Sequence, residues 1–133
     1  MLTFLILFGI TFIMFLIIDL LWLGLIAKNL YQKYLGHLLT PDVNWFAAII
    51  FYVLFIIGLV FFVVEPAVEQ SNLWYAIGAG TFFGFITYAT YDLTNLATLK
   101  TWPVKITIID LIWGSFLGGT TSTLAYLVYQ IIF

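Results

Sequence analysis

The stretch LTFLILFGITFIMFLIIDLLWLGLIA, residues Leu2–Ala27, is almost entirely apolar and carries a single charged residue, Asp19. A helix needs about 20 apolar residues to cross the hydrocarbon core of a bilayer, and this stretch is long enough. No basic residue precedes the apolar run, and it ends at Ala27-Lys28 without the small-residue pattern of a cleavage site. These features differ from those of a cleavable signal peptide. We therefore expect a helix that remains in the membrane.

Three more apolar stretches have the length of a membrane span. We place them at Trp45–Val64, Leu73–Leu99 and Ile106–Phe133. Runs such as Phe4–Ile18 lack the alternation of polar and apolar residues that a β-barrel requires. Of the 133 residues, 65% are hydrophobic and only 8% are charged, which excludes a soluble domain with a water-facing surface. The sequence predicts an all-α, integral membrane bundle of four transmembrane helices in one domain.

The few cations are unevenly distributed between the three connections. The four lysines lie in the first connection and around the third, at Lys28, Lys33, Lys100 and Lys105. The second connection carries Glu65 and Glu69 and no cation. Because cytoplasmic loops are enriched in Lys and Arg, we expect the first and third connections inside and both termini outside.

Three aspartates, Asp19, Asp92 and Asp110, lie inside the predicted helices. A carboxylate in hydrocarbon is costly, so it commonly marks a functional site. Counted from the cytoplasmic helix ends, they lie roughly 12 Å, roughly 10 Å and roughly 7 Å deep, and Tyr52 lies at roughly 10 Å. All four helices therefore contribute to one polar layer. For Asp110 alone, an interfacial position near a helix start is an equal alternative.

Aromatic and amide residues accompany the aspartates, because residues three or four apart share a helix face. The matching strings IIDLLW at 17–22 and IIDLIW at 108–113 place a tryptophan beside an aspartate in two helices. Such a match hints at the inverted repeats of transporters. The candidate ligand-binding residues are Asp19, Trp22, Tyr52, Tyr88, Asp92, Asn95, Asp110 and Trp113. The ordinary alternative for the aromatic residues is packing or anchoring at the membrane surface.

The chain has no arginine and no lysine in the middle of a predicted span. Converging carboxylates would then not all be ionised, because desolvation and like-charge repulsion both favour the neutral form. We expect at least one to hold a proton or to share a bound cation, with Asp19, Asp92 and Asp110 as candidate metal ligands and a divalent cation as the candidate cofactor. Asp92 is the expected central group, with Tyr88 and Asn95 placed to hydrogen-bond it.

Two glycine motifs, GTFFG at 80–84 and GSFLG at 114–118, predict that the third and fourth helices pack closely. We expect a homo-oligomer, because four short helices enclose little volume, with Gly114–Thr123 as the contact if the third helix leaves it free. The segment Lys28–Asn44 has the spacing of an amphipathic segment on the membrane surface. Trp102 is expected at headgroup level.

Several classes of chemistry are excluded by what the chain lacks. Without cysteine it has no disulfide and no thiolate metal site, and without arginine it has no bidentate phosphate clamp. No basic face is present, so we expect no nucleic acid partner, and the lipid bilayer is the expected environment. Three interpretations remain: a binder or carrier of a proton, metal ion or small cationic solute; a membrane enzyme acting on a lipid or apolar substrate; and an accessory or scaffold subunit. The first is favoured.

The strings YATYDLTNLATLK at 88–100, DLLWLG at 19–24 and DLIWG at 110–114 carry a resemblance. Together they resemble an uncharacterised family of small bacterial membrane proteins that is grouped as a domain of unknown function. The resemblance extends over nearly the whole chain. It implies a four-helix protein of the bacterial inner membrane, and it implies no activity and no catalytic residue.

Overall fold

The computed structural model describes residues 1–133, and all of its regular structure is helical. The elements in chain order are α1 (Leu2–Leu21), the π-helical turn η1 (Trp22–Ile26), α2 (Lys28–Leu35), α3 (Trp45–Leu59), the π-helical turn η2 (Val60–Val64), α4 (Glu65–Glu69), α5 (Leu73–Thr98) and α6 (Val104–Ile132). Because the π-helical turns continue their neighbours, the chain forms five helical segments. The predicted all-α class is confirmed, and α2 is a separate helix within the predicted first connection.

Two of the five segments, Leu2–Ile26 and Trp45–Glu69, are both long enough and apolar enough to cross a membrane. The second continues past its predicted end at Val64, because η2 leads directly into α4. Helices α5 and α6 have 26 and 29 residues, also the length of a span, but carry many glycine and hydroxyl residues. Helix α2 has 8 residues and is too short to cross. Four segments therefore have the length of a span, and two also have the apolar character.

Side chains next to the helices explain where α3 and α5 begin. The Asn44 side chain accepts a hydrogen bond from the backbone N–H of Ala47 at 3.1 Å, and that of Asn72 accepts one from Tyr75 at 3.0 Å. Both asparagines satisfy a backbone donor that the first turn of a helix leaves free. Helix α6 begins directly after Pro103, whose fixed φ suits the start of a helix.

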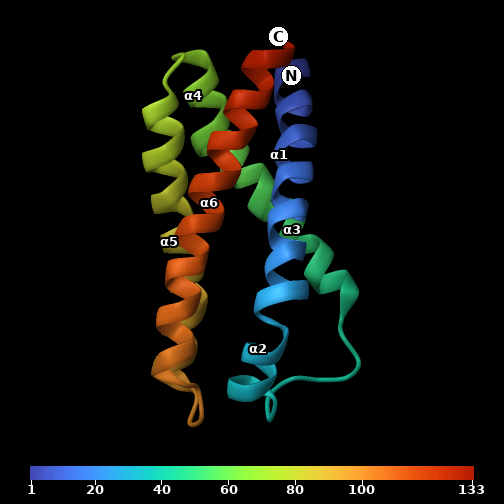
Figure 1. The fold of residues 1–133 in the computed structure, drawn as a ribbon, viewed down its shortest axis with the longest axis vertical. Helices are drawn as coiled ribbons and strands as arrows, with labels where there is room; N and C mark the ends of the chain where they lie inside the picture. Colours follow the sequence, from blue (N-terminus) through green and yellow to red (C-terminus); the bar gives the residue numbers. More distant parts are fainter.

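Figure 1 shows α1, α5 and α6 along the long axis of the molecule, with α3 crossing at an angle. Both chain termini lie at one end, together with α4, and α2 and the α5–α6 connection lie at the other end. Helices α1 and α6 therefore run in opposite directions. This arrangement places the amino-terminal half of α6 beside the carboxyl-terminal half of α1, which is where the two matching strings lie.

Glycines bring α5 and α6 into close contact, as the two motifs predict. A Cβ atom on Gly84 would meet the carbonyl oxygen of Gly114, and a Cβ on Gly118 would meet that of Gly80. Glycine is therefore required at this crossing. We expected Gly114–Thr123 to contact a second copy only if α5 left this segment free. In the structure α5 packs against Gly114, Gly118 and Gly119, so the segment is not free. The homo-oligomer stays a prediction without that contact.

A hydrophobic core joins α1, α3, η2 and α6. Its buried members are Leu7, Phe15, Phe55, Ile56, Leu59, Val60, Val63, Val64, Trp113, Leu117 and Ala125. Trp113 belongs to this core and also borders a cavity. The core therefore borders the cavity at Trp113.

Candidate ligand-binding cavity

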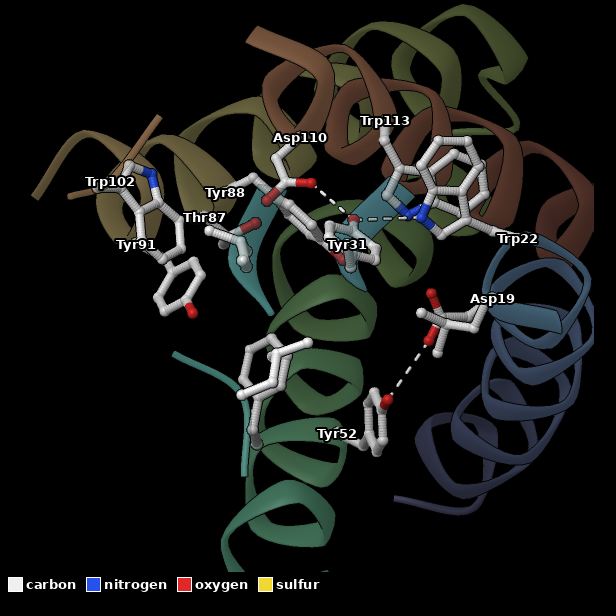
Figure 2. Close-up of a pocket in the computed structure, with 14 residues that line it drawn as sticks. Asp19, Trp22, Tyr31, Tyr52, Thr87, Tyr88, Tyr91, Trp102, Asp110 and Trp113 are labelled. Carbon is white, nitrogen blue, oxygen red and sulfur yellow. Dashed lines mark hydrogen bonds between the residues drawn. The ribbon is translucent and has the colours of Figure 1, made fainter. Parts of the chain in front are cut away.

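A cavity of about 490 Å³ lies among α1, α3, α5 and α6, with α2 along one side (Figure 2). Small-molecule sites in proteins commonly enclose roughly 300 to roughly 1,000 Å³. The lining residues are Asp19, Trp22, Leu23, Tyr31, Leu35, Leu39, Phe51, Tyr52, Thr87, Tyr88, Tyr91, Trp102, Asp110 and Trp113. Two of these are carboxylic acids, eight are aromatic and none is a cation. The cavity is thus acidic with aromatic walls.

The structure brings six of the eight predicted site residues together around this cavity. These are Asp19, Trp22, Tyr52, Tyr88, Asp110 and Trp113. Asp92 lies behind the lining and is 0% exposed. Asn95 is half-buried and does not border the cavity. Helix depth and shared helix faces therefore predicted six of the fourteen lining residues, while two predicted residues of α5 lie elsewhere.

Asp110 is held by a short chain of hydrogen bonds that begins at Trp22 of η1. The indole N–H of Trp22 donates to the Tyr31 hydroxyl at 3.2 Å, and Tyr31 donates to Oδ1 of Asp110 at 2.6 Å (Figure 2). Burial, together with the hydrogen bond to Asp110, raises the pKa of Tyr31 above its usual range. The phenol therefore stays protonated and remains a donor. Since Tyr31 belongs to α2, this short helix is fixed to the carboxyl group in the cavity.

Asp19 is less tightly held than Asp110. The hydroxyl of Tyr52 donates to its Oδ2 at 3.4 Å, a long hydrogen bond, and the Trp113 side chain also interacts with its carboxyl group. The Tyr52 ring in turn packs edge-on against Phe15, with ring centroids 5.5 Å apart. A carboxyl group with weak internal partners keeps capacity to accept hydrogen bonds from a ligand.

The π-helical turn η1 begins at Trp22, three residues after Asp19. Such turns are inserted in α-helices frequently at functional sites, because they change the direction of side chains. The indole of Trp22 stacks on that of Trp113, with ring centroids 4.3 Å apart and planes 9° apart. The tryptophans of the two matching strings therefore meet face to face, and the aspartates of the same strings border one cavity.

Asp92 and Asp110 face each other across the α5–α6 contact. Their carboxyl groups interact directly, and neither oxygen of Asp92 accepts a hydrogen bond from a donor. The expected hydrogen bonds from Tyr88 and Asn95 to Asp92 are therefore not formed. The reason is the direction of these side chains, since the Tyr88 ring lies over Gly114 and Asn95 interacts with Tyr91.

The three aspartates do not gather into a group that could hold a metal ion. Asp92 faces Asp110, whereas Asp19 pairs with Tyr52. In Figure 2 the hydroxyl of Tyr31 and the indole of Trp22 lie along the way from Asp110 to Asp19. This geometry does not support a single metal site made by all three aspartates, and metal binding by Asp19, Asp92 or Asp110 stays a prediction.

Several lining residues were missed because they come from segments that we placed on the membrane surface. They are Tyr31, Leu35 and Leu39 from α2 and the chain after it, and Trp102 from the α5–α6 connection. Trp102 is buried, its indole donates to the Thr107 hydroxyl at 3.0 Å, and its ring meets Tyr91 edge-on. The amphipathic spacing of the α2 segment was a signal for these residues, but an apolar helix face covers a cavity as well as a lipid surface.

Further contacts fix α2 to the α5–α6 connection. The ammonium group of Lys105 lies over the ring of Tyr34, 5.4 Å from its centroid, and His37 Nε2 shares a hydrogen bond with the Thr101 hydroxyl at 2.9 Å. Leu35 is buried in the same small apolar cluster as Trp102. Helix α2 is thus part of the cavity wall.

A comparison with known families gives one match, to the family described as "Predicted membrane protein (DUF2177)", over residues 4–127. None of the curated proteins and none of the solved structures that were searched matches the chain. The matched range includes every residue of the cavity lining. The resemblance drawn from the sequence is confirmed, and the chain belongs to this family of predicted membrane proteins.

Proposed function

We propose that this protein is a multi-pass membrane protein that binds a small organic cation in the cavity bordered by Asp19 and Asp110, as a binder or carrier of that solute. The observation that carries the proposal is the composition of the cavity wall: two carboxyl groups, eight aromatic rings and no cationic side chain. A concave site lined by one sign of charge concentrates ligands of the opposite sign. A polar layer that only specified helix packing would leave no such space.

Aromatic walls favour an organic cation over a bare metal ion. The face of an indole or phenol ring attracts a cation, and recognition of quaternary ammonium groups by aromatic cages is a common use of this attraction. A divalent metal ion requires several oxygen ligands at short distances, and the carboxyl groups here are not gathered in that way. The volume of about 490 Å³ also suits a molecule larger than a single ion.

The proposal includes four crossings of a bacterial inner membrane, by α1 with η1, by α3 through α4, by α5 and by α6. Their lengths support it, as does the position of both termini at one end of the bundle in Figure 1. All four lysines are exposed and belong to α2, the α5–α6 connection or the first turn of α6, which lie at the opposite end. By the positive-inside rule, this distribution supports a cytoplasmic location for that end.

Binding of choline to the purified chain in lipid nanodiscs, measured by calorimetry, tests the proposed function. Dimethylbutanol, the uncharged carbon analogue of choline, is the matched ligand control. We expect choline to bind and its analogue to bind at least about tenfold more weakly, because a cation over aromatic faces and beside a carboxylate gains at least about 1.4 kcal/mol. Equal binding of both compounds would contradict the proposal.

A pair of aspartate variants locates the binding. Asp19→Asn removes one carboxylate from the cavity wall and should weaken choline binding by about tenfold. Asp42→Asn is the matched control, because Asp42 is exposed in the connection before α3 and does not border the cavity. Unchanged affinity in Asp19→Asn would place choline outside this cavity.

A further inference from the structure

Asp92 is the one carboxyl group of the site that does not border the cavity. It is 0% exposed, and neither of its oxygens has a hydrogen-bond donor. An ionised carboxylate in such surroundings is strongly disfavoured unless it is paired with a cation or receives hydrogen bonds. Its one direct side-chain partner is the carboxyl group of Asp110.

The groups around this pair offer no positive charge. The ionisable neighbours are Asp110 on α6, Tyr31 on α2, Tyr88 and Tyr91 on α5 itself, and, beyond Tyr88, Asp19 on α1 and Tyr52 on α3. None of them is a lysine. An ionised carboxylate can only accept hydrogen bonds. Two carboxyl groups in contact therefore share a hydrogen bond only if one of them is protonated. Two like charges at this separation, away from water, do not persist together.

Asp110 has the geometry of the ionised member of the pair. Its Oδ1 accepts a 2.6 Å hydrogen bond from Tyr31, a short distance that is typical of an O–H donor on a carboxylate. Asp92 then carries the proton and donates it to Asp110. Because Asp110 borders the cavity and Asp92 does not, Asp110 is the route by which that proton reaches the cavity.

We propose that Asp92 and Asp110 form a proton-binding site, which holds one proton in the free protein and releases it when a cation enters the cavity. The proton site stands on its own geometry, and its coupling to a cation rests on the proposed function. In the free protein the pair carries one negative charge. On cation entry the O–H bond of Asp92 breaks, the proton leaves to water through Asp110, and both groups become carboxylates. One positive charge replaces another, so the net charge of the site is unchanged.

Such an exchange makes cation affinity depend on pH. If one proton leaves for each cation bound, affinity increases by about tenfold for each unit of rising pH while the pair is protonated in the free protein. The linkage is reciprocal, so the cation must also weaken proton binding. A chain that exchanges a proton for an organic cation across a membrane would be an antiporter for that class of solute.

Infrared spectroscopy of the full chain in nanodiscs tests the proton site without any cation ligand. At about pH 7, where ordinary aspartate and glutamate side chains are ionised, we expect one protonated carboxyl band. That band should disappear in Asp92→Asn. In Asp110→Asn it should shift in frequency, because Asp92 stays buried and protonated but loses the carboxylate that accepts its hydrogen bond. It should remain unchanged in Asp19→Asn and in the exposed control Asp42→Asn. Two independent variants keep the assignment testable if one of them fails to fold. Absence of a protonated carboxyl band from the unmodified chain would overturn the proton site, whatever the chain binds.

Proton release on choline addition, followed with a pH-sensitive dye in weak buffer, tests the coupling. We expect about one proton for each choline bound by the unmodified chain, and no release by Asp92→Asn, whose choline affinity should no longer vary with pH. If choline binds without proton release, the coupling is wrong. If the infrared band is present and choline does not bind, the proposed function fails and the proton site stands.

Discussion

The indole rings of Trp22 and Trp113 lie parallel, with centroids 4.3 Å apart and planes 9° apart. Each tryptophan also interacts with the aspartate of the other Asp-Leu-x-Trp string. Trp113 interacts with Asp19, and Trp22 is linked to Asp110 by hydrogen bonds through Tyr31. Because α1 and α6 are antiparallel, the two Asp-Leu-x-Trp strings meet in a locally inverted arrangement. The stack therefore fixes the positions of both carboxyl groups around the cavity.

Replacing either tryptophan by alanine should remove the same spectroscopic feature. Stacked indoles couple their electronic transitions, so we expect a paired positive and negative band in circular dichroism that is lost in Trp22→Ala and in Trp113→Ala alike. The two variants should also be non-additive in unfolding free energy by about 0.5–1.5 kcal/mol, the interaction of an aromatic pair. Trp74→Ala is the control, because Trp74 is 78% exposed. Persistence of the paired bands in both variants would show that the rings do not stack in solution.

Tyr31 should remain a neutral phenol at alkaline pH. Its pKa is raised by burial and by the hydrogen bond to Asp110, so the folded chain retains this proton where an ordinary tyrosine, with a pKa of about 10, loses it. Because the pKa of Tyr31 is higher in the folded chain than in the unfolded chain, the protonated phenol stabilises the fold at pH values below the unfolded pKa of about 10. This stabilisation is lost as the pH rises above about 10 towards the folded pKa. The difference in phenolate absorbance between the unmodified chain and Tyr31→Phe should therefore stay near zero at that pH. A normal titration in this difference would mean that α2 does not bury Tyr31.

The sequence predicted the parts of this fold that depend on periodicity and length. Apolar runs located the long helices, and depth along those helices predicted that Asp19, Tyr52 and Asp110 would lie near one another. The position of Asp92 could not be predicted in this way, because depth along a helix does not specify which side of the helix faces which neighbour. Its contact with Asp110, and the exclusion of Asp19 from that pair, follow from the rotation imposed by the glycine crossing of α5 and α6.

The contribution of α2 could not be predicted from its sequence for a related reason. Its apolar residues have a spacing that suits a membrane surface, and the same spacing suits a helix that packs over a cavity. The choice between the two is made by tertiary contacts at its carboxyl-terminal side, from Leu35 to Trp102 and from His37 to Thr101. None of these contacts is encoded in a local pattern.

The close approach of α5 and α6 makes a sharp prediction for two glycines of the same helix. In Gly84→Ala the new methyl group would meet the backbone of Gly114 and Gly118, so the helices must separate, at a cost of about 1–3 kcal/mol. In Gly78→Ala nothing lies within 4 Å of the new Cβ, so the higher helix propensity of alanine should leave stability unchanged or raise it by up to about 1 kcal/mol. Unfolding in a denaturing detergent measures both. Equal stability of the two variants would contradict the close crossing.

The proposed orientation of the chain in the membrane would decide from which side the proposed cation reaches the cavity. The cavity is covered by α2, and α2 lies at the lysine-bearing end of the bundle. Reporter fusions at Phe133 and within the segment Glu65–Asn72 should therefore both be active outside the cytoplasm. Fusions after Leu39, in the connection before α3, should be active inside.

Lysine variants test the cause of this orientation. Lys33→Gln combined with Lys100→Gln halves the cationic residues at that end, so we expect a larger fraction of molecules in the opposite orientation, measured with the same reporters. Lys28→Arg is the matched control, because it keeps the charge. A cytoplasmic reporter at Phe133 in the unmodified chain would overturn the predicted topology and place α2 on the outer side. The cavity would then receive its ligand from outside the cell, and proton release on binding would acidify that side.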